Sequence, residues 1–357
     1  DSLRVSRGKL ADAYLPRGVT TVRSCGDNER WIPMLEDWMR QAPDAPDFYP
    51  CGAALVSPND RNFSGHVTVA DSAAARAKVR QYHDLGFRHL KVYWRLKEAE
   101  FGPAMDEARR LGMNVTGHVD FRLLGIHKAL ELGLRQFEHA YTLGVDALDD
   151  STYAYDNGQI FVDHYLGYIH DNQMPGSFFI SRMEMFNSLG PDNPALLRVI
   201  DDLKAHGAGV TPTLHVFAQR FHLSWFTTPS RKPGYDDTDV VADSALARCQ
   251  AGYRNLQGYV KRMYDAGIPL TVGTDWAEPG KATLSEMLLL HDCGLPMTAV
   301  FACATVNGAR AMGLAEDTGT IAPGRKANLI LFAADPLTNP KNLLGARTVL
   351  KDGIPLP

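Results

Sequence analysis

The sequence lacks the features of several protein classes. Its 357 residues carry a formal net charge of −4 and no concentrated basic stretch, which argues against nucleic acid or an anionic membrane as the main partner. No apolar run reaches the roughly 18 residues that a membrane-spanning helix needs. With 45% hydrophobic residues, the chain can bury one large domain with an appendage, or two domains. We therefore expect a small-molecule substrate and no nucleic-acid or membrane partner.

The cysteines are few, and no targeting segment is visible. The five cysteines are scattered, form no C-x-x-C pair and indicate no disulfide framework. The N-terminus has no charged segment followed by an apolar one, although a signal peptide could lie upstream of Asp1. Together these features favour a cytoplasmic location.

One pattern recurs along the chain: an amphipathic helix, a glycine that ends it, and a short apolar strand. In residues 71–86, for example, Asp71 and Ser72 cap a helix that ends at Gly86. Strands that alternate with helices imply parallel pairing through right-handed crossovers. The pattern predicts seven strands, one fewer than a closed (β/α)8 barrel contains, near residues 19–23, 50–55, 89–93, 114–118, 135–139, 209–214 and 269–274.

Three segments depart from this pattern. Residues 141–195 form a long insertion rich in Tyr, Phe, Asn and His. Residues 223–243 are loop-like and follow a predicted strand, so we expect a lid at the catalytic rim. The tail resembles short strands joined by turns, which predicts a barrel domain over residues 1–314 and a small β-sandwich appendage over residues 315–357.

Polar residues lie at or near the ends of four predicted strands. Lys91 comes late in one strand, His118 and His139 end two others, and Asp275 ends a fourth. In a (β/α)8 barrel these strand ends converge on the face where the reaction site is built. Two imidazoles and a carboxylate at that face are a metal site by ligand type.

Each of these residues taken alone has an ordinary structural explanation. A single strand histidine is more often hydrogen-bonded within the fold than a metal ligand, and Asp275 could cap a helix. Lys91 could extend its ammonium group to the rim. Their equivalent positions in four strand–helix units favour a common site. Burial also disfavours the charged form of Lys91, and a neutral amine can react with carbon dioxide to give a metal-binding carbamate.

The chain resembles the amidohydrolase superfamily, closest to its imidazolonepropionase-like and Xaa-Pro-dipeptidase-like branch. The resembling stretches follow the expected order over almost the whole chain: LPRGVTTVRSCGD, HLKVYW, VTGHVD, QFEHAY, GVTPTL, VGTDW and TGTIAPGRKANLILFAADPL. The resemblance implies that a carboxylated Lys91 bridges two divalent metals, with zinc as the expected ion. It also implies that His118 and His139 are metal ligands, and that Asp275 is both a ligand and the catalytic base.

One departure from the family concerns the first barrel strand, which in the family ends in a His-x-His pair. None of the twelve histidines here has another histidine two positions away. An open seven-stranded barrel would expose two strand edges. We therefore expect the missing strand and its histidine pair to lie upstream of Asp1. The alternative is a divergent homologue that lacks the pair and holds one metal or none.

The resemblance implies hydrolysis of an amide or cyclic amide C–N bond in a dipeptide, an N-acyl amino acid or a similar small molecule. A metal-activated hydroxide would attack the carbonyl, and Asp275 would transfer the proton. Tyr93, Arg95, Tyr141 and His215 are candidate substrate contacts, although a surface salt bridge explains Arg95 equally well and packing explains a rim aromatic or histidine.

Two other functions remain compatible with the sequence. A deaminase of the same superfamily would usually use one metal without the bridging lysine, so Lys91 counts against it. A catalytically silent barrel that serves as a binding or scaffold protein is favoured by the missing His-x-His pair and opposed by the four retained residues. The family often forms dimers or larger rings, so a homo-oligomer is compatible with the resemblance.

Overall fold

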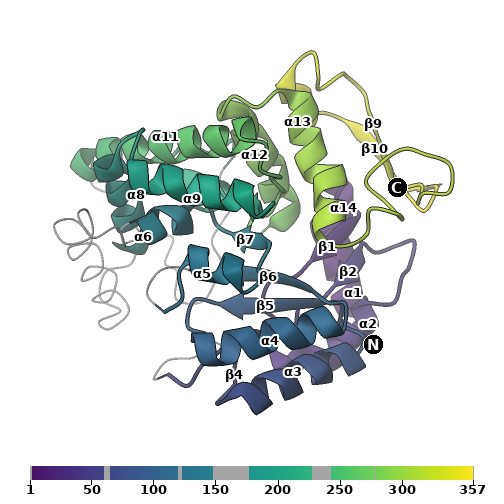
Figure 1. Cartoon of the computed structure of the whole chain (residues 1–357). Helices are drawn as coiled ribbons and strands as arrows, with labels where there is room; N and C mark the ends of the chain where they lie inside the picture. Colours follow the sequence, from purple (N-terminus) through teal and green to yellow (C-terminus); the bar gives the residue numbers. More distant parts are fainter. Residues whose placement is uncertain are drawn as a thin grey trace. The chain divides into compact units, whose positions relative to one another are not determined.

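The computed structural model describes residues 2–59, 65–119, 123–147, 177–226, 243–276 and 278–356 (Figure 1). The chain divides into two compact units. The first comprises Asp1–Glu138 together with Ala302–Pro357, and the second comprises His139–Phe301. Among the described residues, no helix is both long and apolar enough to cross a membrane.

The first unit is built on a parallel sheet with the strand order β4-β3-β5-β6-β7. These strands are β3 (Ala54–Val56), β4 (His66–Thr68), β5 (His89–Tyr93), β6 (Asn114–His118) and β7 (Gln136–Glu138). A second parallel pair consists of β1 (Thr21–Arg23) and β2 (Asp47–Tyr49). The α/β class with parallel strands is therefore confirmed.

Helices join these strands along the chain. They are α1 (Ser2–Tyr14), η1 (Leu15–Arg17), η2 (Glu29–Trp31), α2 (Ile32–Trp38), α3 (Ser72–Asp84), α4 (Glu98–Arg110) and α5 (Ile126–Glu131). The predicted cap of α3 is present, because the Asp71 side chain accepts a hydrogen bond from the Ala74 N–H. The predicted stop is present too, since Gly86 has a φ of 89°, a conformation that a residue with a Cβ rarely adopts.

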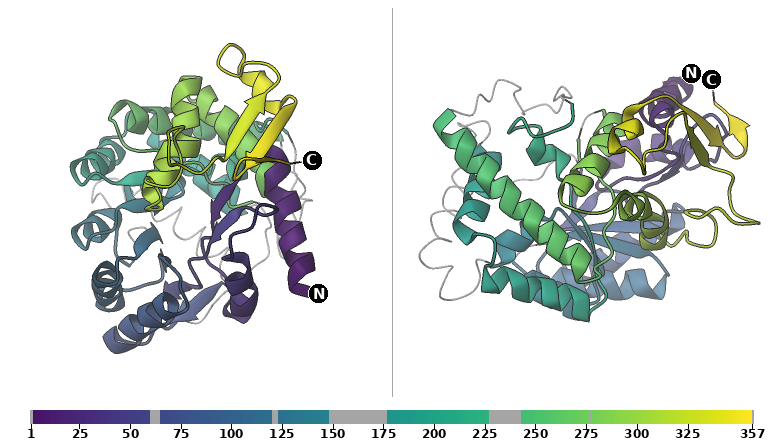
Figure 2. Two further views of the ribbon diagram at one scale, coloured as in Figure 1. Left: turned by 90° about the vertical axis from the view of Figure 1, so that its right-hand side faces the viewer. Right: turned by 90° about the horizontal axis from the view of Figure 1, so that it is seen from above.

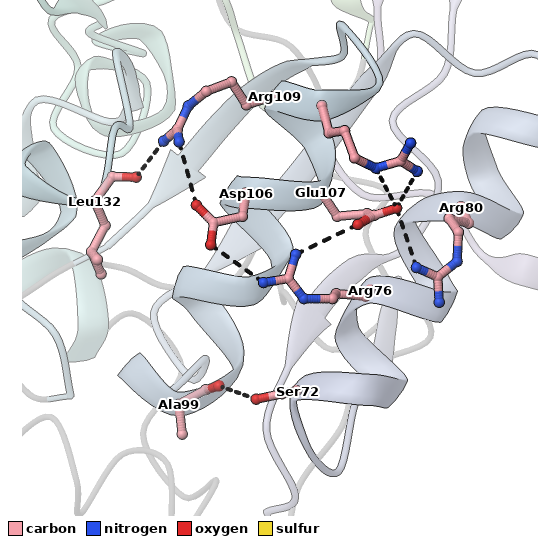
Figure 3. Close-up of polar contacts among 9 residues, drawn as sticks. Ser72, Arg76, Arg80, Ala99, Asp106, Glu107, Arg109 and Leu132 are labelled. Atoms are coloured by element: carbon pink, nitrogen blue, oxygen red, sulfur yellow. Dashed lines mark hydrogen bonds and ion pairs between the residues drawn. The ribbon is translucent and has the colours of Figure 1, made fainter.

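Helices α3 and α4 lie side by side and are joined by ion pairs (Figures 1 and 3). Glu107 of α4 is the centre of this cluster, and its carboxylate contacts Arg76 and Arg80 of α3 and Arg110 of its own helix. The neighbouring Asp106 contacts Arg76 as well. The cluster fixes the two helices against each other on one side of the sheet.

The C-terminal residues of the first unit form a three-stranded antiparallel sheet in the order β11-β10-β9. Its strands are β9 (Leu329–Phe332), β10 (Arg347–Lys351) and β11 (Ile354–Pro355), and η4 (Cys303–Asn307), α14 (Gly308–Ala311) and η5 (Pro340–Leu344) complete this segment. Buried Asp47 of β2 pairs with Lys326 and Lys351, at 2.8 Å and 3.2 Å. These ion pairs tie the C-terminal sheet to β2. The boundary at residues 314 and 315 stays a prediction.

The second unit is mainly helical and contains one strand, β8 (Gly209–Thr211), among its described residues. Figure 2 shows α11 as the longest of its helices, and α11 packs against α8. The helices are α6 (Tyr141–Ala147), α8 (Ser177–Leu189), α9 (Pro194–Ala205), α10 (His215–Ala218), α11 (Asp243–Asp265), α12 (Pro279–Asp292) and α13 (Met297–Ala302).

The predicted strands differ from the structure at a few places. The segment near residues 269–274 forms only an isolated bridge between Val210 and Leu270 in the described structure. β2 and β4 were not predicted as strands. The predicted insertion begins in α6, contains α8 and ends in α9, and its residues 148–176 lie outside the described residues. The predicted lid lies outside them over residues 227–242, and α11 begins directly afterwards.

Candidate active site

The first unit presents a row of polar side chains on one face of its parallel sheet. Lys91 of β5 is in register with Thr116 of β6, and Tyr93 is in register with His118. Alternate residues of a strand point to the same face, so these four side chains share a face, while Leu90 and Val92 point to the other. Lys91 and His118 are 2% and 4% exposed, respectively. Two of the four predicted metal ligands therefore lie on neighbouring strands and on the same face.

The amine of Lys91 is the unusual group on this face. Its Nζ is buried and has no hydrogen-bond partner among the residues that the structure describes. A buried polar group without a partner costs free energy, and such groups are rare in folded proteins. The position therefore suits a group that gains its partner from a bound ion or a modification.

Glu138 at the end of β7 organises the polar groups around Lys91. Its carboxylate lies 2.5 Å from the guanidinium of Arg23, the last residue of β1, and it also accepts a hydrogen bond from the Thr116 hydroxyl. The Cys25 thiol lies 3.7 Å from the same carboxylate oxygen. Burial alone would lower the pKa of Arg23, but Cys25 and Glu138 together raise it. Arg23 therefore stays a cation on this face.

Aromatic and cationic groups continue the face toward the ends of the strands. The Tyr93 ring contacts His66 and His118, with ring centroids 4.5 Å and 4.8 Å away. Burial, aided by the nearby charges of Arg95 and Lys91, lowers the pKa of His66 to about 4, so this imidazole is neutral at pH 7. Arg95 stacks on the Trp94 ring and donates a hydrogen bond to Asn59.

His139 opens the second unit directly after the end of β7. Its backbone adopts a φ of 69°, which is uncommon for a residue with a side chain. The N–H of His139 donates to the Thr211 carbonyl at 2.8 Å, and its Nδ1 lies 3.0 Å from the Thr213 hydroxyl. The ring stacks on Tyr141 at 5.5 Å. The contact between Nδ1 and the Thr213 hydroxyl fixes which ring nitrogen of His139 is presented to a ligand.

Asp275 also belongs to the second unit and has a left-handed backbone, with a φ of 46°. Its side chain is exposed. The alternative that Asp275 caps the following helix does not hold for α12, because that helix begins at Pro279 and its N-cap residue is Glu278. Strained backbone at a residue with a carboxylate is frequent at functional sites.

His215, a predicted substrate contact, is 0% exposed in the second unit. Its Nδ1 lies 2.9 Å from the Ser285 hydroxyl, and its backbone N–H donates to the Glu286 carboxylate. Burial lowers the pKa of His215 to about 4, and burial raises the pKa of Glu286 to about 7. Through these hydrogen bonds, the side chains of His215 and Glu286 fix the position of the segment that follows β8.

The structure thus places the predicted residues in two groups. Lys91, His118 and Tyr93 share one face in the first unit, and Arg95 follows them. His139, Tyr141, His215 and Asp275 belong to the second unit. Among the described residues, no group of three or more His, Cys, Asp or Glu side chains is arranged to hold a metal.

Sequence reasoning did not select several polar residues of the first-unit face: Arg23, Cys25, His66, Thr116 and Glu138. The signal for two of them was present, because Glu138 directly precedes His139 and Arg23 lies in the stretch VTTVRSCGD. Their association required β1 and β7 to be brought together, which spacing along the sequence does not reveal.

The donor set of the first unit fits a divalent metal in two respects. Lys91 offers a buried amine without a protein partner in the described structure, and His118 offers an imidazole on the adjacent strand. Imidazole nitrogen and carbamate or carboxylate oxygen are the ligands that zinc takes in proteins. The first-unit face therefore provides the types of ligand that a divalent metal such as zinc requires.

Comparison with known proteins identifies relatives of the chain. Residues 10–353 match the sequence profile described as the Amidohydrolase family. A segment of 100 residues is 32% identical to imidazolonepropionase of Geobacillus kaustophilus and covers 26% of this chain and 24% of that protein. The chain therefore spans about a quarter of the length of that curated relative.

Solved structures resemble the chain over nearly its full length. A bottromycin amidohydrolase has a TM-score of 0.70 and 21% identity, with 98% of this chain and 73% of that chain covered. A Xaa-Pro dipeptidase with methionine bound in its active site has a TM-score of 0.62 and 18% identity, with 98% and 77% covered. Together with the profile match, these similarities support a fold based on a (β/α)8 barrel.

Proposed function

Since the chain belongs to the amidohydrolase family, we propose that it is a metal-dependent hydrolase that cleaves an amide or cyclic amide C–N bond of a small molecule. The observation that carries the proposal is the buried amine of Lys91, which has no partner among the described residues and lies on the same sheet face as His118. A purely structural lysine at this position would be expected to have an acidic partner, as buried Lys351 has in Asp47.

We assign metal binding to Lys91, His118, His139 and Asp275, with Lys91 acting as a carbamate. One or two divalent ions, zinc being the expected metal, would supply a water molecule that is deprotonated near neutral pH and would polarise the substrate carbonyl. The family resemblance supports all four proposed ligands. The geometry of the first unit supports two of them, because Lys91 and His118 offer suitable ligand types on a common sheet face.

Arg23 is a further charged group of the first-unit face and keeps its positive charge beside Glu138. A cation favours a nearby anion. Arg23 is therefore expected to stabilise the anionic carbamate that forms when the Lys91 amine attacks carbon dioxide.

Asp275 is the proposed proton carrier of the reaction. Its carboxylate is exposed, so it can accept a proton from water and deliver that proton to a leaving amine. The neighbouring Trp276 is 7% exposed and anchors the segment. The carboxylate is thus presented from a fixed backbone.

The substrate is proposed to carry a carboxylate, as a dipeptide or an N-acyl amino acid does. Arg95 is 6% exposed, and its guanidinium is held in one orientation by stacking 4.6 Å from the Trp94 ring. A guanidinium fixed in this way binds a carboxylate through two parallel hydrogen bonds. Tyr93, which lies between two histidine rings, is the proposed wall of the substrate site.

The test is turnover of a substrate panel by zinc-supplemented protein. Dipeptides, N-acyl amino acids and cyclic amides would be assayed for release of the free amine. We expect cleavage of at least one class with a free carboxylate, and loss of turnover by at least a thousandfold in Asp275→Asn. The matched control is Asp265→Asn at the end of α11, whose carboxylate pairs with Lys261 on the surface.

Two results would contradict the proposal. Asp275→Asn protein that is folded and cleaves at the wild-type rate would remove the assigned proton carrier. Wild-type protein that binds zinc but releases ammonia from an aminated ring, and cleaves no amide, would favour a deaminase.

A further inference from the structure

Cys25 and Cys51 occupy neighbouring positions on two adjacent parallel segments of the first unit. Strands β1 and β2 pair with Arg23 opposite Tyr49. Beyond the strands, the Asp27 N–H donates to the Gly52 carbonyl at 2.8 Å. The register is therefore the same on both sides of the cysteines, which places Cys25 opposite Cys51.

This register brings the two cysteines within reach of a covalent bond. Neighbouring strands lie about 4.8 Å apart, and disulfides join residues whose Cα atoms are roughly 4.4–6.8 Å apart. Side chains at the same register position of parallel strands point to the same face. The Ser24 hydroxyl strengthens the pairing here, because it accepts a hydrogen bond from the Cys51 N–H at 3.1 Å.

The surroundings of the two thiols differ in a way that suits stepwise oxidation. Cys25 is exposed, whereas Cys51 is 0% exposed. The Arg23 guanidinium lies 3.6 Å from the Cys25 sulfur. The hydrogen bond with the Cys51 thiol lowers the pKa of Cys25, and the Arg23 guanidinium acts in the same direction, while the Glu138 carboxylate opposes both. Cys25 is therefore the thiol that an oxidant reaches first.

We propose that Cys25 and Cys51 are a redox modification site, at which a low-molecular-weight disulfide converts the two thiols into a reversible disulfide in the folded protein. The site contains none of the proposed metal ligands, and the disulfide can form whether or not the proposed reaction takes place. The other three cysteines of the chain lie elsewhere in the sequence and are buried: Cys249, Cys293 and Cys303.

The chemistry balances with glutathione disulfide as the oxidant. The Cys25 thiolate attacks one sulfur of glutathione disulfide, the S–S bond of that molecule breaks, and one glutathione thiolate leaves. The Cys51 thiol then loses its proton and attacks the Cys25 sulfur, which releases the second glutathione. The protein loses two electrons and two protons, and both appear in two molecules of reduced glutathione.

The formation of this bond would change the polar face that contains Lys91. The Cys25 thiol now lies 3.7 Å from the Glu138 carboxylate, beside the Arg23–Glu138 ion pair. Oxidation removes the thiol proton and turns the sulfur toward Cys51. Glu138 directly precedes His139 in the sequence, so the redox state is expected to be felt beside a proposed metal ligand.

The experiment is mass spectrometry of the folded full chain after incubation with glutathione disulfide. We expect wild-type protein to lose the mass of two hydrogen atoms, to yield a peptide in which Cys25 is linked to Cys51, and to recover its mass with dithiothreitol. Cys51→Ser should instead retain one glutathione on Cys25, because the thiol that would displace it is gone. Cys303→Ser is the matched control and should behave as wild type.

Two outcomes would overturn the proposal without reliance on any variant. Wild-type protein that keeps glutathione on Cys25 would show that Cys51 does not reach that sulfur. Wild-type protein in which neither cysteine changes, while both react after denaturation, would show that the fold keeps the pair apart or closed to the oxidant.

Discussion

Lys91 lies opposite Thr116 in the register of β5 and β6, yet the Thr116 hydroxyl is bonded to Glu138 and not to Lys91. The Lys91 amine has no hydrogen-bond partner among the described residues. A buried polar group left in this state costs about 1–3 kcal/mol. The fold therefore keeps Lys91 at a cost in stability, which is typical of residues retained for function.

Lys91→Met tests this cost directly. Methionine fills a similar volume without a polar group, so the free energy of unfolding of the metal-free protein should stay unchanged or rise by up to about 2 kcal/mol. Urea unfolding followed by circular dichroism measures the change. Lys351→Met is the matched control: Lys351 is 0% exposed but pairs with Asp47, so its loss should cost about 3 kcal/mol. A comparable loss in Lys91→Met would show that Lys91 has a stabilising partner.

The ion pair between Arg23 and Glu138 should be strongly coupled. The two side chains are 12% and 4% exposed, so removal of either leaves the other charge buried and unpaired. We expect Arg23→Ala and Glu138→Ala each to lower the free energy of unfolding by about 3 kcal/mol, and the double variant to lose far less than the sum. A double-mutant cycle from urea unfolding gives the coupling energy. Additive losses would show that the two charges act independently.

The local pattern of the sequence predicts the strands β5 and β6 with the bounds that the structure shows, because each follows a helix that ends at a glycine. The three-residue strands β2 and β4 were missed, since so short a stretch carries little periodicity. The turn residues of the tail predicted short C-terminal strands, and in the structure these strands form a single three-stranded antiparallel sheet.

The candidate site was only partly predictable for a similar reason. Lys91 and His118 were selected because a charged or ionisable residue near the end of a predicted strand stands out in a sequence. Arg23 and Glu138 were not, because their contact joins β1 to β7 and depends on how the chain closes on itself. The contact between Cys25 and Cys51 depends likewise on the register of two segments.

Glu107 should make the α3–α4 pair sensitive to acid. The hydrogen bond from Arg110, aided by Arg80, lowers the pKa of Glu107 to about 2 from its ordinary 4.5. The folded state therefore gains stability from this carboxylate above pH 4.5, and the gain is lost as the pH falls toward 2. Glu107→Gln should lower the free energy of unfolding at pH 7 by about 1 kcal/mol, since its arginine partners are partly exposed and screened by solvent.

The measurement for Glu107 is urea unfolding of variant and wild type from pH 7 down to pH 3, where the difference should shrink. The matched control is Asp106→Asn, because Asp106 is 55% exposed and its ion pairs should contribute less than about 0.5 kcal/mol (Figure 3). A Glu107→Gln deficit that is the same at every pH would contradict the assigned role of the charge.

Glu286 should give the opposite pH dependence. Burial raises the pKa of this carboxyl to about 7, against the lowering effect of the Leu214 and His215 N–H groups that bond to it. Its ordinary value is 4.5, so the folded state binds a proton that the unfolded state releases between pH 4.5 and 7. The contribution of Glu286 to stability is therefore present below pH 4.5 and is lost as the pH rises to about 7.

Glu286→Gln removes the titration but keeps only one of the two oxygens that accept from the Leu214 and His215 N–H groups, so it also carries a loss of stability that does not change with pH. Relative to wild type, the variant should gain stability as the pH rises from 4.5 to 7, by up to about 1.4 kcal/mol per pH unit. Urea unfolding across this range measures the gain, with Glu278→Gln at the exposed start of α12 as the control. A difference between Glu286→Gln and wild type that does not change with pH would contradict the raised pKa.

The most direct test of the account is the divalent metal content of the purified chain, measured by inductively coupled plasma mass spectrometry after zinc loading and dialysis. We predict that wild-type protein retains about one to two zinc ions per chain, and that Lys91→Met and His118→Asn retain clearly less while remaining folded. Wild-type protein that retains no metal, or variants that retain as much as wild type, would contradict the claim that Lys91 and His118 hold a catalytic metal.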